Sequence, residues 1–180
     1  IAGTQKIINF CSENKIKLIY SATSASLGNQ GNDQNLSPYA YSKSINLNLI
    51  INMSKWFHLK YEILYFYNVY GKRHIQKGPM STVIGIFEDL FDKNLPMTVV
   101  KPGYQQRKFT HIEDTIKGCI YAWKKNSNRE YILSSSKNYK ILDIAKFFSN
   151  KIKFLPSRSG ERYQSKIVTK INGRKVYRIK

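Results

Sequence analysis

Acidic residues are scarce in this sequence. Its 180 residues hold 11 Asp and Glu against 30 Lys and Arg, which gives a formal net charge of +19 at pH 7. Such a surplus is typical of chains that bind nucleic acid, anionic membranes or phosphorylated small molecules. The basic residues are spread along the whole chain and form no block like a basic tail, so a composition biased toward Lys, Ile and Asn is the simpler explanation.

Cysteine and long apolar runs are scarce as well. Cys11 and Cys119 lie far apart, each within an apolar helical pattern, which predicts free buried thiols in a reducing compartment and no disulfide framework. No apolar run approaches the roughly 18 residues that span a bilayer, and no leader opens the chain. The three histidines have no metal-ligand spacing. We therefore expect a cytoplasmic protein with no membrane association and no metal.

Helical and strand patterns alternate through the first part of the chain. Helices are predicted over residues 3–14 and 38–58, and strands over residues 17–22 and 61–71. Glycine and asparagine dominate the loop between residues 27 and 37. This alternation predicts βαβ units with a parallel sheet and right-handed crossovers.

A smaller α/β region follows Gly71. The patterns predict three helices and three strands, over residues 81–94, 113–125 and 142–150 and over residues 97–100, 130–135 and 151–155. Residues 160–180 have too few periodic apolar positions to be assigned. The fold class is thus α/β, with a parallel sheet and a smaller C-terminal part.

The stretch SPYAYSKS, residues 37–44, carries a tyrosine and a lysine four positions apart. On a helix, Tyr39 and Lys43 lie one turn apart on the same face, about 5–6 Å between Cβ atoms. A neighbouring ammonium favours the phenolate and lowers the pKa of a tyrosine, so the pair suits acid–base chemistry. A hydroxyl cluster, from Ser21 to Ser26, follows the preceding strand at the end where α/β sheets bind ligands.

Several motifs in order resemble one family, although Y-x-x-x-K by itself is a weak signal. The hydroxyl-bearing strand and S-P-Y-x-x-S-K are followed by NVYGKR, RKFTHIED and RSGE, at residues 68–73, 107–114 and 158–161. This set resembles the extended short-chain dehydrogenase/reductase superfamily, specifically its NAD-dependent nucleotide-sugar epimerases. The resemblance covers nearly all of residues 1–165.

The resemblance implies a catalytic role for three residues. Tyr39 exchanges a proton with a sugar hydroxyl while hydride passes to or from NAD. Lys43 lowers the pKa of Tyr39 and holds the nicotinamide ribose, and Thr23 hydrogen-bonds the reacting oxygen. Tyr39, Lys43 and Tyr67 would contact the cofactor.

The resemblance also implies a binding site for a nucleotide-diphosphate sugar. Asn68, Arg107 and Arg158 would contact the diphosphate, because the arginine fork suits phosphate geometry. Glu161 would accept a hydrogen bond from a ribose hydroxyl. Simpler interpretations are that Asn68 only caps a strand end and that Glu161 only pairs with Arg162. Tyr65, Phe66 and Tyr70 are expected in the core.

Two departures from the family pattern qualify the resemblance. Related 4,6-dehydratases place Asp-Glu after the catalytic Thr, whereas Ser24 and Ala25 follow Thr23 here, which favours an epimerase or a reductase. The N-terminal G-x-x-G-x-x-G fingerprint that approaches the cofactor pyrophosphate is missing. The expected fold is therefore a partial Rossmann-like sheet with an exposed edge in residues 1–75, and a nucleotide-sugar-binding region in residues 76–180.

The leading hypothesis is a NAD-dependent nucleotide-sugar epimerase of UDP-glucose 4-epimerase type, present as the C-terminal portion of the enzyme. The alternatives are a reductase of the same fold, a catalytically inactive remnant, and a basic module that binds nucleic acid. The last is disfavoured because the basic residues cluster on no single element. A homodimer through the Tyr39-bearing helix is expected from the resemblance. The sugar and the base are not fixed by any motif.

Overall fold

A five-stranded sheet forms the larger part of the structure, a computed structural model that describes residues 1–27 and 37–179. The strand order is β1 (Leu18–Thr23), β2 (Tyr61–Phe66), β7 (Arg129–Leu133), β11 (Arg174–Ile179) and β10 (Lys170–Ile171). The first four strands are parallel and β10 runs antiparallel to β11. The α/β class with a parallel sheet is confirmed. Most of the predicted glycine-rich loop lies outside the described residues.

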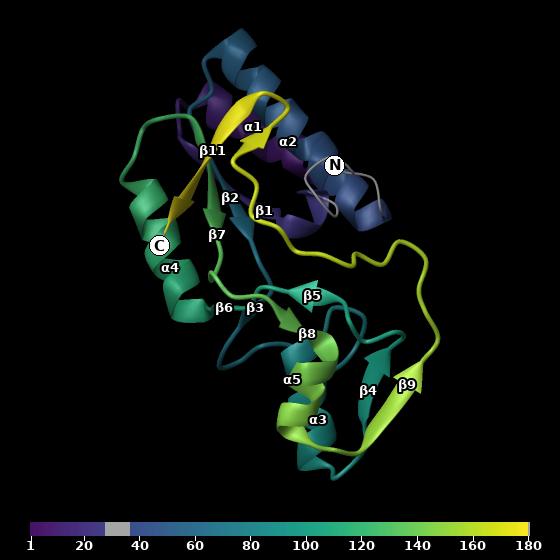
Figure 1. Cartoon of the computed structure of the whole chain (residues 1–180). Helices are drawn as coiled ribbons and strands as arrows, with labels where there is room; N and C mark the ends of the chain where they lie inside the picture. Colours follow the sequence, from purple (N-terminus) through teal and green to yellow (C-terminus); the bar gives the residue numbers. More distant parts are fainter. Residues whose placement is uncertain (28–36, 180) are drawn as a thin grey trace.

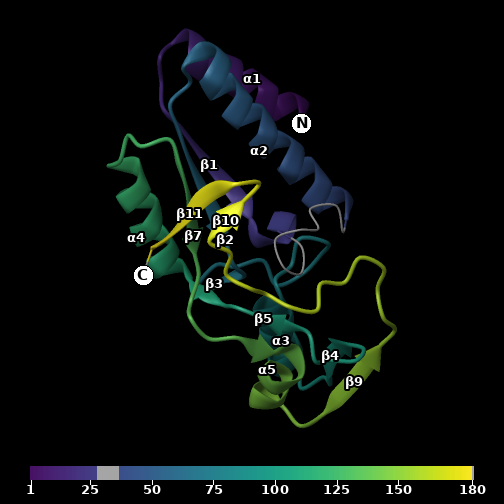
Figure 2. The same ribbon diagram turned by 45° about the horizontal axis from the view of Figure 1, so that its top comes forward.

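Helices cover both faces of this sheet (Figures 1 and 2). Helices α1 (Ala2–Glu13) and α2 (Pro38–Phe57) pack side by side on one face, and α4 (Ile112–Trp123) lies on the other. The alternation of side chains along a strand divides the core. From β2, Ile63 and Tyr65 join the cluster under α1 and α2, whereas Leu64 joins the cluster under α4.

Local signals fix both ends of α2, the helix that carries Tyr39 and Lys43. The Ser37 hydroxyl accepts a hydrogen bond from the Ala40 amide at 3.2 Å, and Pro38 occupies the first helical turn. The helix ends at His58, whose φ of 56° lies in the left-handed region. Tyr39 and Lys43 therefore stand in the first two turns, beside the carboxyl end of β1.

A smaller α/β unit lies below the main sheet in Figure 1. Its core is formed by Phe87, Met97, Val99 and Ala145. The surrounding elements are α3 (Val83–Asp92), α5 (Ile141–Phe148) and the parallel strands β4 (Met97–Val100) and β9 (Ile152–Leu155). Short elements link the two parts: η1 (Ser24–Leu27), β3 (Val69–Tyr70) with β6 (Thr110–His111), and β5 (Gln106–Arg107) with β8 (Tyr139–Lys140).

The C-terminal residues, which the sequence patterns left unassigned, extend the main sheet. Strands β10 and β11 form a hairpin whose two-residue turn is Asn172-Gly173, with φ values of 46° and 78°. Asn-Gly is a strong signal for such a turn, because both positions require positive φ. Strands β7 and β11 lie beyond residue 75 in the sequence, so the sheet draws on both of the regions expected from the sequence.

A buried carboxylate ties the C-terminal hairpin to the sheet. Glu130 in β7 accepts a hydrogen bond from the Tyr65 hydroxyl at 2.7 Å and pairs with the Nε of Arg174 at 2.5 Å. The side chain of Glu130 is only 3% exposed. Burial of a charge is costly unless it is paired and hydrogen-bonded, and both conditions are met here.

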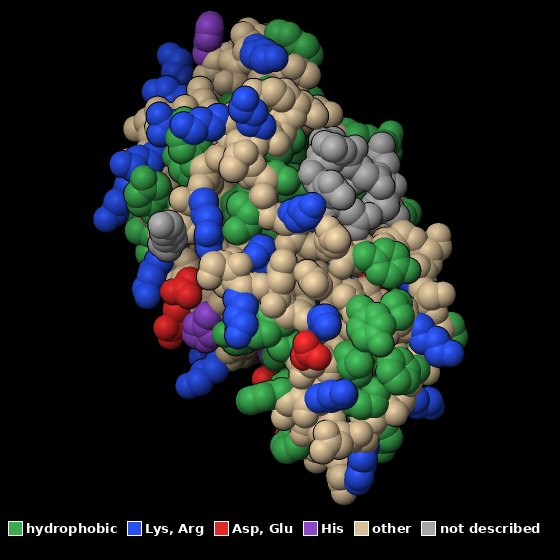
Figure 3. Space-filling view, in the orientation of Figure 1, with side chains coloured by type: hydrophobic (Ala, Val, Ile, Leu, Met, Phe, Trp, Pro, Cys, Tyr) green, Lys and Arg blue, Asp and Glu red, His purple; other side chains and the backbone are tan. Residues whose placement is uncertain are grey.

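Charge is unevenly distributed over the surface. On the face that Figure 3 shows, lysine and arginine side chains are scattered over both halves, whereas acidic side chains show only in the lower half. None of the helices in the described part of the chain has the length and hydropathy needed to cross a membrane.

We expect Arg174→Ala to lower the free energy of unfolding by about 3–5 kcal/mol, because it leaves the buried Glu130 carboxylate without its cation. Urea unfolding measures the effect. Lys175→Ala, a neighbouring exposed position in the same strand, is the control and should change stability by no more than about 0.5 kcal/mol. Equal stabilities for the two variants would contradict the role assigned to the pair.

Candidate active site

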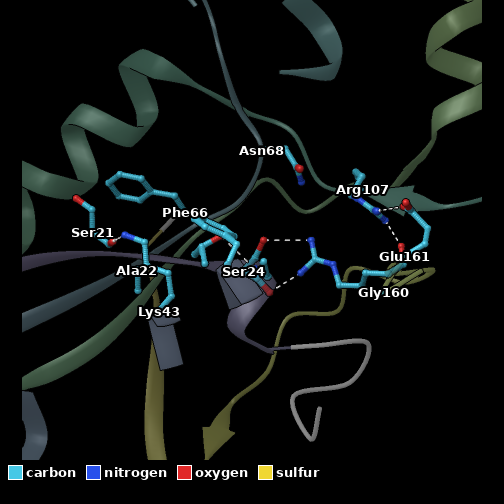
Figure 4. Close-up of a pocket in the computed structure, with 13 residues that line it drawn as sticks. Ser21, Ala22, Ser24, Lys43, Phe66, Asn68, Arg107, Gly160 and Glu161 are labelled. Carbon is cyan, nitrogen blue, oxygen red and sulfur yellow. Dashed lines mark hydrogen bonds and ion pairs between the residues drawn. The ribbon is translucent and has the colours of Figure 1, made fainter. Parts of the chain in front are cut away.

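A cavity of about 500 Å³ lies at the carboxyl ends of β1 and β2 (Figure 4). Five stretches of the sequence meet there: the end of β1 with the start of η1, the start of α2, the end of β2 with Asn68, Arg107 in β5, and residues 160–162. The side chains that matter for its chemistry are those of Thr23, Ser24, Tyr39, Lys43, Phe66, Asn68, Arg107, Glu161 and Arg162. The carboxyl end of a parallel sheet is the usual place for ligands in such folds.

The three predicted catalytic residues all line this cavity. Thr23 ends β1, and its hydroxyl accepts a hydrogen bond from the Ala25 amide at 3.2 Å. Tyr39 is 51% exposed. The Lys43 ammonium donates to the Ser21 carbonyl at 3.1 Å and lies 5.1 Å from the centre of the Tyr20 ring. Burial lowers the pKa of Lys43.

Two guanidinium groups and one carboxylate form the opposite wall. Arg107 pairs with Glu161 at 2.6 Å and also donates to the Gln106 carbonyl at 3.0 Å and to the Arg162 carbonyl. Arg162 donates to the Ser24 carbonyl and to the Ser24 hydroxyl, the latter at 3.2 Å. The dashed lines in Figure 4 mark those of these contacts that join cavity-lining residues, namely Arg107 with Glu161 and Arg162 with Ser24.

Burial lowers the pKa of both arginines in this wall, and a neighbouring guanidinium adds to the effect for one of them. Burial lowers the pKa of Arg107, although Glu161 opposes the shift. Burial, together with Arg107, lowers the pKa of Arg162 to about 10, so both groups stay charged at neutral pH. Two cations against one carboxylate leave a net positive charge. This wall therefore suits a bound anion, and a diphosphate matches the arginine fork.

The structure brings Arg162 to the cavity and leaves Arg158 outside it. Arg158 is exposed and does not line the cavity, whereas Arg162, four residues later, does. Glu161 pairs with Arg107 and not with Arg162, the simpler partner suggested by the sequence. Asn68 lines the cavity, and its side-chain amide donates to the Lys108 carbonyl at 2.8 Å.

Tyr67 and Phe66 differ from their sequence-based assignments. Tyr67, expected near the nicotinamide, is 0% exposed and its hydroxyl donates to the Lys166 carbonyl at 2.9 Å. Phe66, expected in the core, packs partly buried against the cluster under α4 and also lines the cavity, because the parallel register sets it opposite Thr23. Neighbouring residues at a strand end point to opposite sides, so one position decides which ring reaches the ligand.

A second, larger cavity of about 1180 Å³ lies between α4 and α5. Tyr70, His111, Tyr121, Leu133 and Phe148 are among its lining residues. Tyr70, Phe109, Thr110, His111 and Asp114 of the motifs at residues 68–73 and 107–114 line it, but none of the residues to which the resemblance assigns a catalytic or binding role does. Among the described residues, no cluster of His, Cys, Asp and Glu could hold a metal ion.

Comparison with known proteins agrees with the motifs. The model of the NAD-dependent epimerase/dehydratase family matches residues 1–134, so the chain belongs to this family. The family is one of NAD-dependent enzymes. A putative UDP-glucose 4-epimerase of Methanocaldococcus jannaschii is 30% identical over 136 residues, which are 69% of this chain and 44% of that protein. The chain thus spans less than half the length of this curated relative.

Solved structures share the fold. A UDP-glucuronic acid 4-epimerase from Bacillus cereus, in complex with a fluorinated UDP-glucuronic acid and NAD, is 27% identical with a TM-score of 0.82, over 92% of this chain and 57% of that one. A UDP-N-acetylglucosamine 4-epimerase from Methanobrevibacter ruminantium is 24% identical with a TM-score of 0.82, over 96% and 60%. dTDP-glucose 4,6-dehydratases also share this fold.

The cavity offers groups that suit one end of the family's cofactor. Tyr39, Lys43 and Phe66 bring to it a phenol, an ammonium and an apolar ring. The glycine fingerprint that would cradle a pyrophosphate is missing from the sequence. The described residues therefore provide for the reactive end of NAD and not for its pyrophosphate.

We expect inorganic pyrophosphate to bind at the wall formed by Arg107, Arg162 and Glu161, which we call the arginine wall. Arg162→Ala should weaken binding by about ten- to a hundredfold, because a hydrogen bond to a charged group contributes roughly 1.5–3 kcal/mol. Arg158→Ala removes the same charge four residues away and serves as the matched control. Calorimetric titration measures both variants. A larger loss in Arg158→Ala would show that Arg158 turns inward and that Arg162 only holds the loop.

Proposed function

We propose that this cavity carries the acid–base and diphosphate-binding part of a NAD-dependent nucleotide-sugar epimerase, of UDP-glucose 4-epimerase type. The observation that supports this most directly is the placement of Thr23, Tyr39 and Lys43 in one cavity with Arg107 and Arg162. An acid–base group and a diphosphate site on one cavity are what a nucleotide sugar requires. Family membership and the UDP-glucose epimerase relative point to the same substrate class.

Tyr39 exchanges the proton of the sugar hydroxyl. Tyr39 is half exposed on the cavity wall, which leaves it accessible to a bound sugar, and Lys43 lines the same cavity. The Thr23 hydroxyl donates to the reacting oxygen and keeps it in place. NAD, when bound, accepts and returns the hydride of the same sugar carbon.

The diphosphate lies against the arginine wall. Arg107 and Arg162 each retain N–H donors beyond those used in the contacts described, and Asn68 lines the same cavity. Glu161 accepts a hydrogen bond from a nucleotide ribose hydroxyl with the oxygen that does not face Arg107. These contacts hold the sugar end near Tyr39.

An epimerase is favoured over a dehydratase of the same fold. Elimination of water requires an acid and a base beside the reacting carbon, and the family's dehydratases carry Asp-Glu after the Thr. Here Ser24 and Ala25 follow Thr23, and Ser24 is engaged by Arg162. The only carboxylate among the cavity-lining residues described is Glu161, which pairs with Arg107.

We expect the 180-residue chain, given NAD, to interconvert UDP-glucose and UDP-galactose. Tyr39→Phe should lower the rate by about 10²–10⁴-fold, the usual contribution of a positioned acid–base group, without weakening UDP binding. Tyr41→Phe, which removes an exposed hydroxyl two residues away, is the control and should keep the rate. Product analysis measures the rate of interconversion, NADH absorbance detects any net oxidation or reduction, and calorimetric titration measures UDP binding.

Three outcomes would contradict the proposed function. Full activity after Tyr39→Phe would remove the tyrosine from the mechanism. Net consumption of NADH or NADPH would indicate a reductase. No interconversion by the unaltered chain, with UDP still bound, would leave a nucleotide-sugar-binding protein without this activity.

We also propose that two copies associate through α1 and α2, in a reducing, cytoplasmic setting. Ile7 and Phe10 on α1 and Tyr41 on α2 are large apolar side chains that are exposed on the outer side of this helix pair. Such a concentration of apolar surface is typical of an interface. Both cysteines are free thiols, which supports the compartment.

We expect sedimentation to show a dimer that the double variant Ile7→Glu with Tyr41→Glu converts to a monomer, because charges in an apolar interface lose their solvation. Ile116→Glu, an exposed apolar position on α4, is the control and should leave the dimer intact. A monomer in the unaltered chain would contradict this association.

A further inference from the structure

Basic side chains gather at the amino ends of the parallel strands, opposite the cavity. The register pairs Leu18 with Tyr61, Glu62 with Arg129 and Val176 with Glu130. Lys17 and Lys60 immediately precede β1 and β2, Arg129 begins β7, and Lys175 is the second residue of β11. Four neighbouring strands therefore begin with a cation.

Helix ends add to the same surface. Helices α1 and α4 run antiparallel to the strands, so Lys15 and Lys124, just beyond their last residues, lie at the amino end of the sheet. We call the surface formed by Lys15, Lys17, Lys60, Lys124, Arg129 and Lys175 the basic end. None of these six side chains forms an ion pair within the described residues.

Acidic groups are nearly missing from the basic end. Glu13 is the exposed carboxylate there, since Glu62 and Glu130 are buried within the sheet with hydrogen-bond partners. The other described acidic residues lie elsewhere: Glu88, Asp89, Asp92, Glu113, Asp114, Asp143 and Glu161. Figure 3 shows this asymmetry as basic side chains without acidic ones in the upper half.

A local structural role accounts for one of these cations. Lys17 donates to the carbonyls of Trp123 and Lys125 at the carboxyl end of α4, where a cation complements the helix dipole. Arg129 and Lys175 lie over the Tyr177 ring, 4.5 and 5.0 Å from its centre, and keep their charge at the surface. The remaining cations of the basic end form no ion pair with a described acidic side chain, and Glu13 is the exposed carboxylate near them.

Exposed apolar side chains surround the basic end. Trp56 and Phe57 end α2, Trp123 ends α4, and Ile16 lies between Lys15 and Lys17. Trp56 is 63% exposed and Trp123 is 61% exposed, and they are the only two tryptophans of the sequence. Lysines with exposed tryptophan, phenylalanine and isoleucine are the combination that surface-bound proteins present to the headgroup region of a bilayer.

We propose that the basic end docks on an anionic phospholipid surface, a peripheral contact that departs from the sequence-based expectation of no membrane association. Cations in or next to six elements at one end of the sheet match a broad, flat anionic partner, and the aromatic tips reach the headgroup boundary. A single-stranded nucleic acid requires ring faces for stacking, whereas Trp56 and Phe57 meet edge to face at 84°. Docking in this way turns the cavity, at the carboxyl end of the sheet, away from the membrane.

The test uses vesicles made from an equimolar mixture of phosphatidylcholine and phosphatidylglycerol, with phosphatidylcholine alone as the neutral surface. The full chain should float with the anionic vesicles only, and its tryptophan emission should shift to the blue because both tryptophans lie at the contact. The triple variant Lys60→Glu, Lys124→Glu and Lys175→Glu should bind roughly a hundredfold more weakly, since each lysine near such a surface contributes about 1 kcal/mol.

A matched triple variant distinguishes the effect of charge at the basic end from the effect of net charge on vesicle binding. Lys101→Glu, Lys146→Glu and Lys153→Glu change the charge equally at exposed positions of the smaller unit, and this protein should bind like the unaltered chain. Equal losses in both triples, or binding without an emission shift, would overturn the proposal. So would binding of a single-stranded oligonucleotide that the first triple abolishes while anionic vesicles fail to bind. Circular dichroism checks that both triples remain folded.

Discussion

The parallel pairing of β1 with β2 is the constraint on which the cavity depends. Six residues of each strand run in register, so both strands end at the same edge and Thr23 stands opposite Phe66. Helix α2 returns from that edge and begins there, which sets Tyr39 and Lys43 beside Thr23. A slip of one residue would set Thr23 beside a residue of β2 that faces the other side of the sheet. The part of the cavity proposed for acid–base chemistry thus depends on strand register more than on any single contact.

The anion-binding half depends on a segment that has no regular structure. Residues between β9 and β10 cross from the smaller unit to the main sheet, and hydrogen bonds from Arg162 to Ser24 attach them to the turn after Thr23. Glu161 joins the same segment to Arg107. Because one network holds both the arginines and the turn that follows Thr23, occupation of the anion site and the position of the reacting hydroxyl are physically connected.

The sequence predicts those parts of the site that have local signals. Ser37 and Pro38 mark the start of α2, so the places of Tyr39 and Lys43 follow from the helix period. The choice between Arg158 and Arg162 has no such signal, because it depends on the path of an irregular segment and on a partner, Ser24, that is 138 residues away. Tyr67 and Phe66 differ only in the face of the sheet to which each side chain points, and this decides which of the two rings lines the cavity. The C-terminal hairpin was open to prediction from Asn172-Gly173, although its place beside β7 was not.

The strand order also determines when the main sheet can be completed during synthesis of the chain. Strand β2 pairs on one side with β1, which precedes it, and on the other with β7, which begins at Arg129. During synthesis, one edge of β2 therefore stays unpaired until the stretch from Asn68 to Asn128 has been made and β7 can pair with it. That stretch builds α3, β4 and α4 in the meantime. Non-local pairing of this kind slows folding and leaves an unpaired strand edge that is prone to aggregation. The ends of β1 and β2, which line the cavity, are synthesised before β7, the strand that closes the open edge of β2.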